Sequence, residues 1–251
     1  RDTDRSRGLG DVYKRQSYSY KMPVSSMLAG KLPVTGLLTG MSFVLILAFS
    51  IPLGIFTARH AGGRLDQAMT AVNQVLMAVP AFVTGILLTY VFGLVLRWFV
   101  PGNYVSPGDN LGGSLWYFLF PAVSIALPRV AMTVKMLRSS ILSELQKDYV
   151  RTSHSRGNSD RATLYRHVLR NAMGPVVSFL AMTVADIVAG SVVIEQVFSL
   201  PGLGRMLLTS IANRDYPVVQ AVVVIVAFWV VLVNLLADLI NQRLDPRLRL
   251  Q

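Results

Sequence analysis

Long apolar stretches separated by shorter polar segments make up most of the chain from about residue 33 onward. A helix needs about 20 mostly apolar residues to cross a hydrocarbon core roughly 30 Å thick. Five stretches reach that length, so the pattern predicts an all-α, polytopic membrane protein. The predicted spans cover residues 33–57, 68–96, 116–137, 175–198 and 217–241.

Proline and glycine modify these predicted spans. Pro52, Pro80 and Pro128 lie inside spans, where each removes a backbone donor and predicts a kink. Gly36 and Gly40 lie about one helical turn apart. They either allow a neighbouring helix to approach closely or face lipid.

The composition supports a membrane protein. Of the 251 residues, 53% are hydrophobic and only 15% are charged, which is too apolar for an ordinary soluble domain. A net charge of +11 would indicate nucleic-acid binding only on an accessible basic patch, and here most of the charge lies between apolar stretches. We therefore expect no nucleic-acid partner. The sequence has no cysteine, and its three histidines fall in predicted polar segments, so we expect no metal site.

The distribution of Lys and Arg predicts the orientation. Segments 58–67 and 138–174 together with the C-terminal tail carry twelve Lys and Arg residues, whereas the alternate segments carry three. The positive-inside rule then places the C-terminus in the cytoplasm.

Five spans and a cytoplasmic C-terminus imply one further helix upstream of this fragment if the native N-terminus is also cytoplasmic. The chain starts with Arg1, and residues 1–16, "RDTDRSRGLGDVYKRQ", resemble an adaptor-derived scar. We therefore separate an N-terminal segment, 1–31, from a membrane domain, 32–251.

The polar segment 138–174 has its own helical pattern. The pattern predicts a helix over 138–156 that ends at Gly157, where a left-handed backbone costs glycine least. Ser159 is placed to cap a second helix, with Asp160 in its first turn.

In this second, short amphipathic helix, Tyr165, Leu169 and Ala172 are predicted to share one face, with Arg166 and Arg170 on another. A topology-setting loop without further function and a helix lying on anionic lipid are the alternatives.

Several ordered motifs resemble ABC importer permeases of the dipeptide, oligopeptide and nickel family. "DYVRTSHSRGNS" at 148–159 and "RHVLRNAMGPVV" at 166–177 are similar to the cytoplasmic coupling loop of that family. "VVIEQVFSLPGLGRMLLTSIANRDYPVVQAVV" at 192–223 and "LDPRLR" at 244–249 match further on, and "RDYPVVQ" resembles the first of the two paired permeases. Ser153, His154, Ser155 and Asn158 depart from the family pattern.

The resemblance implies a type I ABC importer bundle, with six membrane helices in the full-length protein and five in this fragment. It implies that this chain lies in the bacterial inner membrane. The implied partners are a homologous second permease, two ATPase subunits that bind ATP and Mg²⁺, and a periplasmic solute-binding protein. The sequence contains no phosphate-binding GxxxxGK[ST] loop, so we expect neither an enzyme nor a cofactor in this chain. Dipeptides, oligopeptides, glutathione and nickel complexes all fit as solutes.

Two sets of candidate site residues follow. The coupling loop gives the predicted ATPase contacts Asp148, Tyr149, Arg151, Thr152, Gly157, Tyr165, Arg166, His167, Leu169, Arg170 and Asn171. The spans give predicted residues of the translocation path or periplasmic mouth: Arg129, Asp186, Glu195, Phe198, Pro201, Gly202 and Gly204. Charges inside a membrane are functional candidates by default. For Arg129, Asp186 and Glu195, pairing between helices for structural reasons is the alternative.

An ion-coupled secondary transporter is the main competing hypothesis, and a structural membrane scaffold is a third. A secondary transporter often contains inverted repeats with broken helices. We find no convincing repeat between the two halves of the chain.

Overall fold

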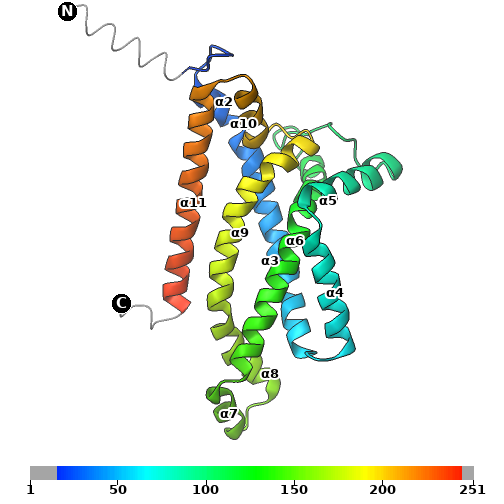
Figure 1. Ribbon diagram of the computed structural model, residues 1–251, viewed down its shortest axis with the longest axis vertical. Helices are drawn as coiled ribbons and strands as arrows, with labels where there is room; N and C mark the ends of the chain where they lie inside the picture. The colour runs from blue at the N-terminus through cyan, green and yellow to red at the C-terminus, as the bar shows by residue number, and fades with distance from the viewer. Residues whose placement is uncertain (1–15, 245–251) are drawn as a thin grey trace, which may run out of the picture. The chain divides into compact units, whose positions relative to one another are not determined.

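A computed structural model describes residues 16–244, and these residues are mainly helical (Figure 1). The predicted scar, except Gln16, and the "LDPRLR" motif, except Leu244, lie outside the described residues. The elements are α2 Val24–Ala29, α3 Leu32–Arg59, α4 Arg64–Ala78, α5 Ala81–Leu88, the π-helix η1 Thr89–Val95, α6 Leu111–Leu145, α7 Asp148–Ser155, α8 Asp160–Thr163, the π-helix η2 Leu164–Val168, α9 Leu169–Val197, α10 Leu203–Ala212 and α11 Tyr216–Leu244.

The predicted all-α membrane fold is confirmed. In the described part of the chain, four helices are long and apolar enough to cross a membrane, and α4 with the segment 81–95 forms a possible fifth, broken span. The four are 24–59, 111–145, 160–197 and 216–240. Each contains one of the predicted spans or most of it.

The kink predicted at Pro80 is a complete interruption of the predicted span 68–96, because α4 and the segment 81–95 meet at a break with a bend of 93°. Helix α4 ends at Ala78, and Val79 is extended, with φ −87° and ψ 120°. Proline disfavours helical geometry in the residue before it and lacks the amide that would continue the helix. Pro52, by contrast, lies within the unbroken α3.

Contacts divide the chain into two compact units. Among the described residues, the first comprises 16–41, Phe82–Ile125 and Ile187–Val230. Here α2, α10 and the start of α11 share a hydrophobic cluster (Figure 1). Its buried members are Val24, Leu28, Leu203, Met206, Val218 and Val222.

Asp215 fixes the segment before α2 to this first unit. The Ser17 hydroxyl donates to its carboxylate, and the Tyr18 amide donates to Oδ1 at 3.1 Å. Burial raises the pKa of Asp215, but these hydrogen bonds outweigh it, and the pKa lies below its usual value. The chain is therefore folded onto the unit from Ser17 onward.

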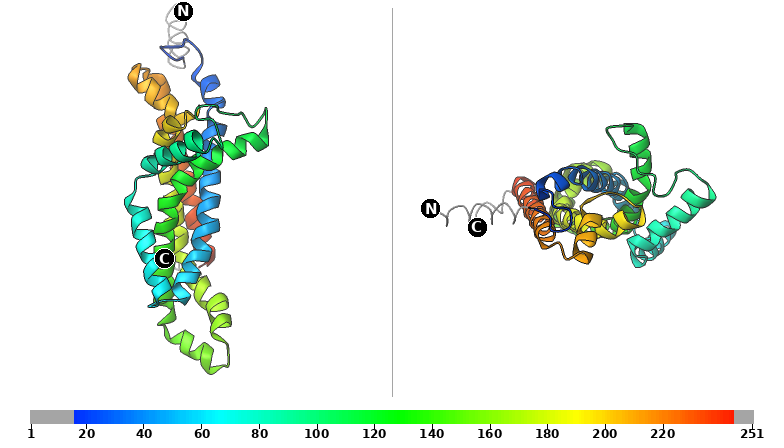
Figure 2. Two further views of the ribbon diagram at one scale, coloured as in Figure 1. Left: turned by 90° about the vertical axis from the view of Figure 1, so that its right-hand side faces the viewer. Right: turned by 90° about the horizontal axis from the view of Figure 1, so that it is seen from above.

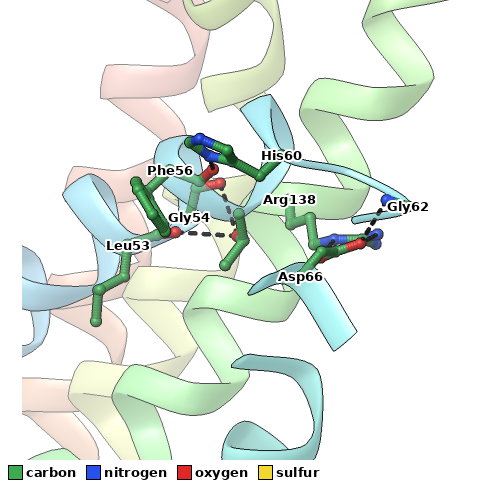
Figure 3. A network of polar contacts seen from close by, with 8 residues as sticks. Leu53, Gly54, Phe56, His60, Gly62, Asp66 and Arg138 are labelled. Carbon is green, nitrogen blue, oxygen red and sulfur yellow. Dashed lines mark hydrogen bonds and ion pairs between the residues drawn. The ribbon is translucent and has the colours of Figure 1, made fainter. Parts of the chain in front are cut away.

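Among the described residues, the second unit comprises Ser42–Ala81, Ala126–Asp186 and 231–244. Its strongest polar contact joins α4 to α6: Arg138 donates from Nε to Asp66 Oδ1 at 2.7 Å and from Nη2 to Oδ2 at 2.6 Å (Figure 3). The Gly62 amide also donates to Oδ2, at 2.9 Å. One carboxylate thus secures the α3–α4 turn to α6.

Helix α3 approaches α6 closely at Gly54. A Cβ atom there would lie 2.8 Å from Leu137 Cδ2, and Leu137 is fully buried. At Gly36 and Gly40 a Cβ would meet nothing within 4 Å. The close approach that the sequence suggested for those two glycines does not occur within the described chain.

Candidate functional site

The polar segment forms a helical hairpin that connects the end of α6 to the start of α9, within the second unit (Figures 1 and 2). We call residues 146–172 the polar hairpin. Helix α6 ends at Leu145, and α7 begins at Asp148 after an extended Lys147, with φ −77° and ψ 150°. The predicted helix over 138–156 is therefore wrong as one element, because this extended residue interrupts it.

The second half of the prediction also needs correction. Residues 160–197 form one continuous helical run that includes the π-helix η2, rather than a separate short helix followed by a span. The short independent helix of the hairpin is therefore α7, which precedes Gly157.

The turn between α7 and α8 has the predicted geometry. Gly157 adopts φ +81°, in the left-handed region, and its amide donates to the His154 carbonyl at 2.8 Å. The Ser159 side chain accepts from the Ala162 amide at 3.3 Å, so the predicted N-cap of the following helix is confirmed.

A buried polar contact closes this turn. The Ser153 and Thr163 hydroxyls lie 2.9 Å apart, and both side chains are buried. Asn158 Nδ2 donates to Ser153 Oγ at 3.1 Å. Ser153 and Asn158 are two of the positions that depart from the family pattern, and no sequence motif indicated this contact.

The root of the hairpin is bound to α6 on both sides. The Ser140 hydroxyl donates to the Ala172 carbonyl at 2.8 Å, and the Tyr149 hydroxyl donates to Glu144 at 2.8 Å. Burial raises the pKa of Tyr149, a contact with Asn171 opposes this rise, and the Glu144 bond adds to it. The hairpin is therefore held to α6 both where it begins, at Tyr149, and where it ends, at Ala172.

The buried face after the turn differs from the predicted one. Leu164, Val168 and Ala172 are buried, at 6%, 0% and 0% exposure, whereas Tyr165 is 46% exposed. Ala172 is thus buried, Tyr165 is exposed, and the exposure of Leu169 is intermediate, although the sequence predicted all three on one face. The spacing of 164, 168 and 172 is also helical, so the periodicity allowed either face.

The remaining predicted coupling residues gather on the outside of the hairpin. The Arg151 side chain is 85% exposed, and that of Asp148 is 97% exposed. In the described part of the chain no carboxylate pairs with Arg166 or Arg170. The exposed positions on this surface are Asp148, Arg151, Thr152, Gly157, Tyr165, Arg166, His167, Arg170 and Asn171.

A cavity of about 380 Å³ lies beside the hairpin in the second unit. Arg59, His154 and Arg161 line its polar side, and Ile141 and Leu145 its apolar side.

The two intramembrane charges Arg129 and Asp186 meet between α6 and α9. Arg129 Nη1 lies 2.7 Å from Asp186 Oδ2, and the side chains are 27% and 56% exposed. The pairing proposed as an alternative from sequence is therefore present.

Glu195 lies elsewhere, inside the first unit, with no exposed surface. Thr35 Oγ1 donates to Oε1 at 2.6 Å, and the Arg205 amide donates to Oε2 at 3.0 Å. The carboxylate thus joins α3 to the first turn of α10, which favours the structural alternative for this residue.

The other residues predicted for the periplasmic mouth, Phe198, Pro201, Gly202 and Gly204, also lie in the first unit. Phe198 is 1% exposed, and its carbonyl accepts from the Tyr117 hydroxyl at 2.6 Å. A Cβ at Gly202 would lie 2.3 Å from Glu195 Cδ, and one at Gly204 would lie 2.4 Å from Val192 Cα. Pro201 lines a separate cavity of about 440 Å³ with Lys31 and Arg205.

Comparison with known families decides the class of protein. Residues 50–250 match the family described as binding-protein-dependent transport system inner membrane component. The chain belongs to this family. It is a multi-pass membrane permease of the ABC importer class, and the ion-coupled alternative is not supported.

Curated relatives extend over most of this permease. A probable peptide ABC transporter permease, y4tP of Sinorhizobium fredii, is 33% identical over 91% of this chain and 73% of its own length. The oligopeptide permease AppB of Bacillus subtilis is 35% identical over 90% of this chain and 72% of its own. The nickel import permease NikB of Staphylococcus aureus is 33% identical over 94% and 68%.

Solved structures share the fold at lower identity. The permease resembles a chain of the inward-facing MetNI methionine ABC transporter with a TM-score of 0.71 at 15% identity, over 88% of this chain and 97% of that chain. An amino acid ABC transporter structure gives a TM-score of 0.65 at 15% identity, over 87% and 94%. These similarities confirm the predicted type I importer fold.

Proposed function

We propose that this permease moves peptides or chemically related small solutes across the bacterial inner membrane, with a cytoplasmic C-terminus. It acts with a second, homologous permease, two ATPase subunits and a periplasmic solute-binding protein. The peptide and nickel permeases among its relatives support this solute class. ATP and Mg²⁺ bind the ATPase subunits, and residues 32–251 form the permease domain.

One observation carries this proposal: the polar hairpin is exposed on its outside yet anchored on its inside. Arg151 is exposed on α7, while the Ser153–Thr163 contact and the Ser140–Ala172 bond fix the hairpin to itself and to α6. A helix anchored in this way transmits a displacement to the membrane helices instead of bending. A loop that only sets topology has no need of such contacts.

The exposed residues have separate roles in this mechanism. Tyr165 supplies an apolar contact with the ATPase, and Arg166 and Arg170 pair with its carboxylates or carbonyl oxygens. Gly157 sets the angle between α7 and the helix that continues into the membrane. The cavity beside His154 and Arg161 receives a side chain of the docked subunit.

The proposal is tested by co-expressing the permease with the proteins encoded by the adjacent genes, purifying the complex and measuring its ATP hydrolysis. We expect a complex that contains ATPase subunits and hydrolyses ATP faster when the solute-binding protein is added. An isolated complex that lacks any ATPase subunit contradicts the proposal.

A further inference from the structure

The described part of the second unit contains two Arg–Asp ion pairs between helices, and the two pairs differ in the number of hydrogen bonds that each carboxylate accepts. Arg138 and Asp66 share two hydrogen bonds, and the Gly62 amide supplies a third to the same carboxylate. Arg129 and Asp186 share one, from Nη1 to Oδ2. Within residues 16–244, Asp186 Oδ1 and the other guanidinium nitrogens of Arg129 have no further bonded partner.

This second pair is also open to its surroundings at a depth where charge is costly. The Asp186 side chain is 56% exposed, whereas the Asp66 side chain in the pair with Arg138 is 6% exposed. Arg129 lies at the middle of the candidate span 111–145, and Asp186 lies inside the candidate span 160–197, at the depth of its partner Arg129. A charge at that depth is tolerated against water or protein and not against lipid tails, so this face of α6 and α9 faces water or another protein surface.

Methionines flank the pair along both helices. Met182 is one turn from Asp186 on α9 and is 64% exposed. Met132 and Met136 follow Arg129 at helical spacing on α6 and are partly exposed. Flexible, polarisable methionine side chains suit a surface that accepts apolar groups of varied shape.

We propose that Arg129 and Asp186 form a binding site for the charged ends of a zwitterionic peptide during its passage. Arg129 binds the terminal carboxylate, Asp186 binds the terminal ammonium group, and the methionines contact the side chains. The ligand exchanges one ion pair within the chain for two with itself, so neither charge is left unpaired. This inference rests on the proposed transport of peptides.

The experiment uses the complete transporter, with both permeases, the ATPases and the binding protein, in proteoliposomes. The probes are dileucine, N-acetyl-dileucine and dileucine amide, each at a concentration that saturates the binding protein. We expect the wild type to transport dileucine about tenfold faster than either blocked peptide, since a hydrogen bond to a charged group contributes roughly 1.5–3 kcal/mol.

Two variants distinguish recognition of the N-terminal end of the peptide from recognition of its C-terminal end. We expect Asp186→Asn to lose the discrimination against the N-acetyl peptide and keep it against the amide. Arg129→Gln is expected to show the reverse. Lys135→Gln is the matched control: it removes another exposed cation of α6, one without an ion pair among the described residues, and is expected to keep both preferences.

Two results overturn the inference. An equal loss of transport for all three probes in both variants shows that the pair only holds the helices or faces the second permease. A wild type that transports peptides without any preference for free ends shows that the pair does not bind them. Failure of the proposed function is distinct, because no peptide is then transported by any version of the complex.

Discussion

Thr35 connects two parts of the first unit through one hydroxyl. It donates to Glu195 at 2.6 Å, and the same oxygen accepts from the Leu203 amide at 2.9 Å. The carboxylate and the start of α10 are therefore held by a single side chain that is only 5% exposed. These contacts favour the structural role that the sequence offered as the alternative to a place at the periplasmic mouth.

Replacing Thr35 by Val should lower the stability of the permease. Both hydrogen bonds are lost while the side-chain volume is nearly unchanged, and leaving buried polar groups unsatisfied costs about 1–3 kcal/mol. The measurement is the midpoint of thermal unfolding in detergent. Thr39→Val is the matched control, since Thr39 Oγ1 is buried without a hydrogen-bond partner and its removal should be neutral or stabilising. Equal midpoints for the two variants would contradict the role of Thr35.

Gly202→Ala should be more damaging than an alanine elsewhere in the same unit. The new Cβ would lie 2.3 Å from Glu195 Cδ, so the carboxylate must move away from its donors. Overpacking of this kind costs about 1–3 kcal/mol. Gly190→Ala serves as the control because its Cβ meets nothing within 4 Å. The yield of folded protein on size exclusion and the unfolding midpoint should both fall for Gly202→Ala only.

Arg138→Gln should destabilise the second unit by about 2 kcal/mol, because the buried Asp66 carboxylate loses its charged partner. Lys147→Gln breaks a pair in which Lys147 is 56% exposed, and exposed pairs contribute at most about 1 kcal/mol. Thermal unfolding of the two variants side by side measures the difference. A larger loss for Lys147→Gln would show that the Asp66–Arg138 pair does not secure α4 to α6.

Gly157→Val should separate ATP hydrolysis from transport. A β-branched residue at φ +81° is strained by about 1–2 kcal/mol, and the turn must change its angle. Gly157→Asn is the control, since asparagine tolerates the left-handed region. The measurement is the number of ATP molecules hydrolysed per solute transported, which should rise for Val and stay near wild type for Asn. Wild-type transport by the Val variant would refute the role of the turn.

Sequence reasoning succeeded where one residue type determines the local structure. The five apolar stretches, the left-handed Gly157 and the Ser159 cap could all be predicted, because length, backbone freedom and a side-chain oxygen each act locally. Val79, before Pro80, shows the limit. A proline inside an apolar run predicts either a kink or a break, and packing decides between them.

The contacts of the site depended on tertiary structure and could not be predicted. Ser153 and Thr163 are ten residues apart, and nothing in either position identifies the other as its partner. Tyr165 and Leu164 are adjacent and both apolar, so periodicity could not establish which one is buried. The Arg129–Asp186 pair could be proposed because unpaired charges in a membrane are costly, but its single hydrogen bond could not.

The most direct test of the central claim is whether an ATPase subunit contacts α7. The sequence has no cysteine, so Arg151→Cys places a single reactive thiol on the exposed side of that helix. Asp109→Cys places one in the exposed segment before α6, which is predicted to lie on the opposite side of the membrane. With a short thiol-reactive photocrosslinker, the account predicts an adduct with an ATPase subunit from position 151 and none from position 109. An adduct from position 109 alone, or from neither position in a complex that hydrolyses ATP, would contradict it.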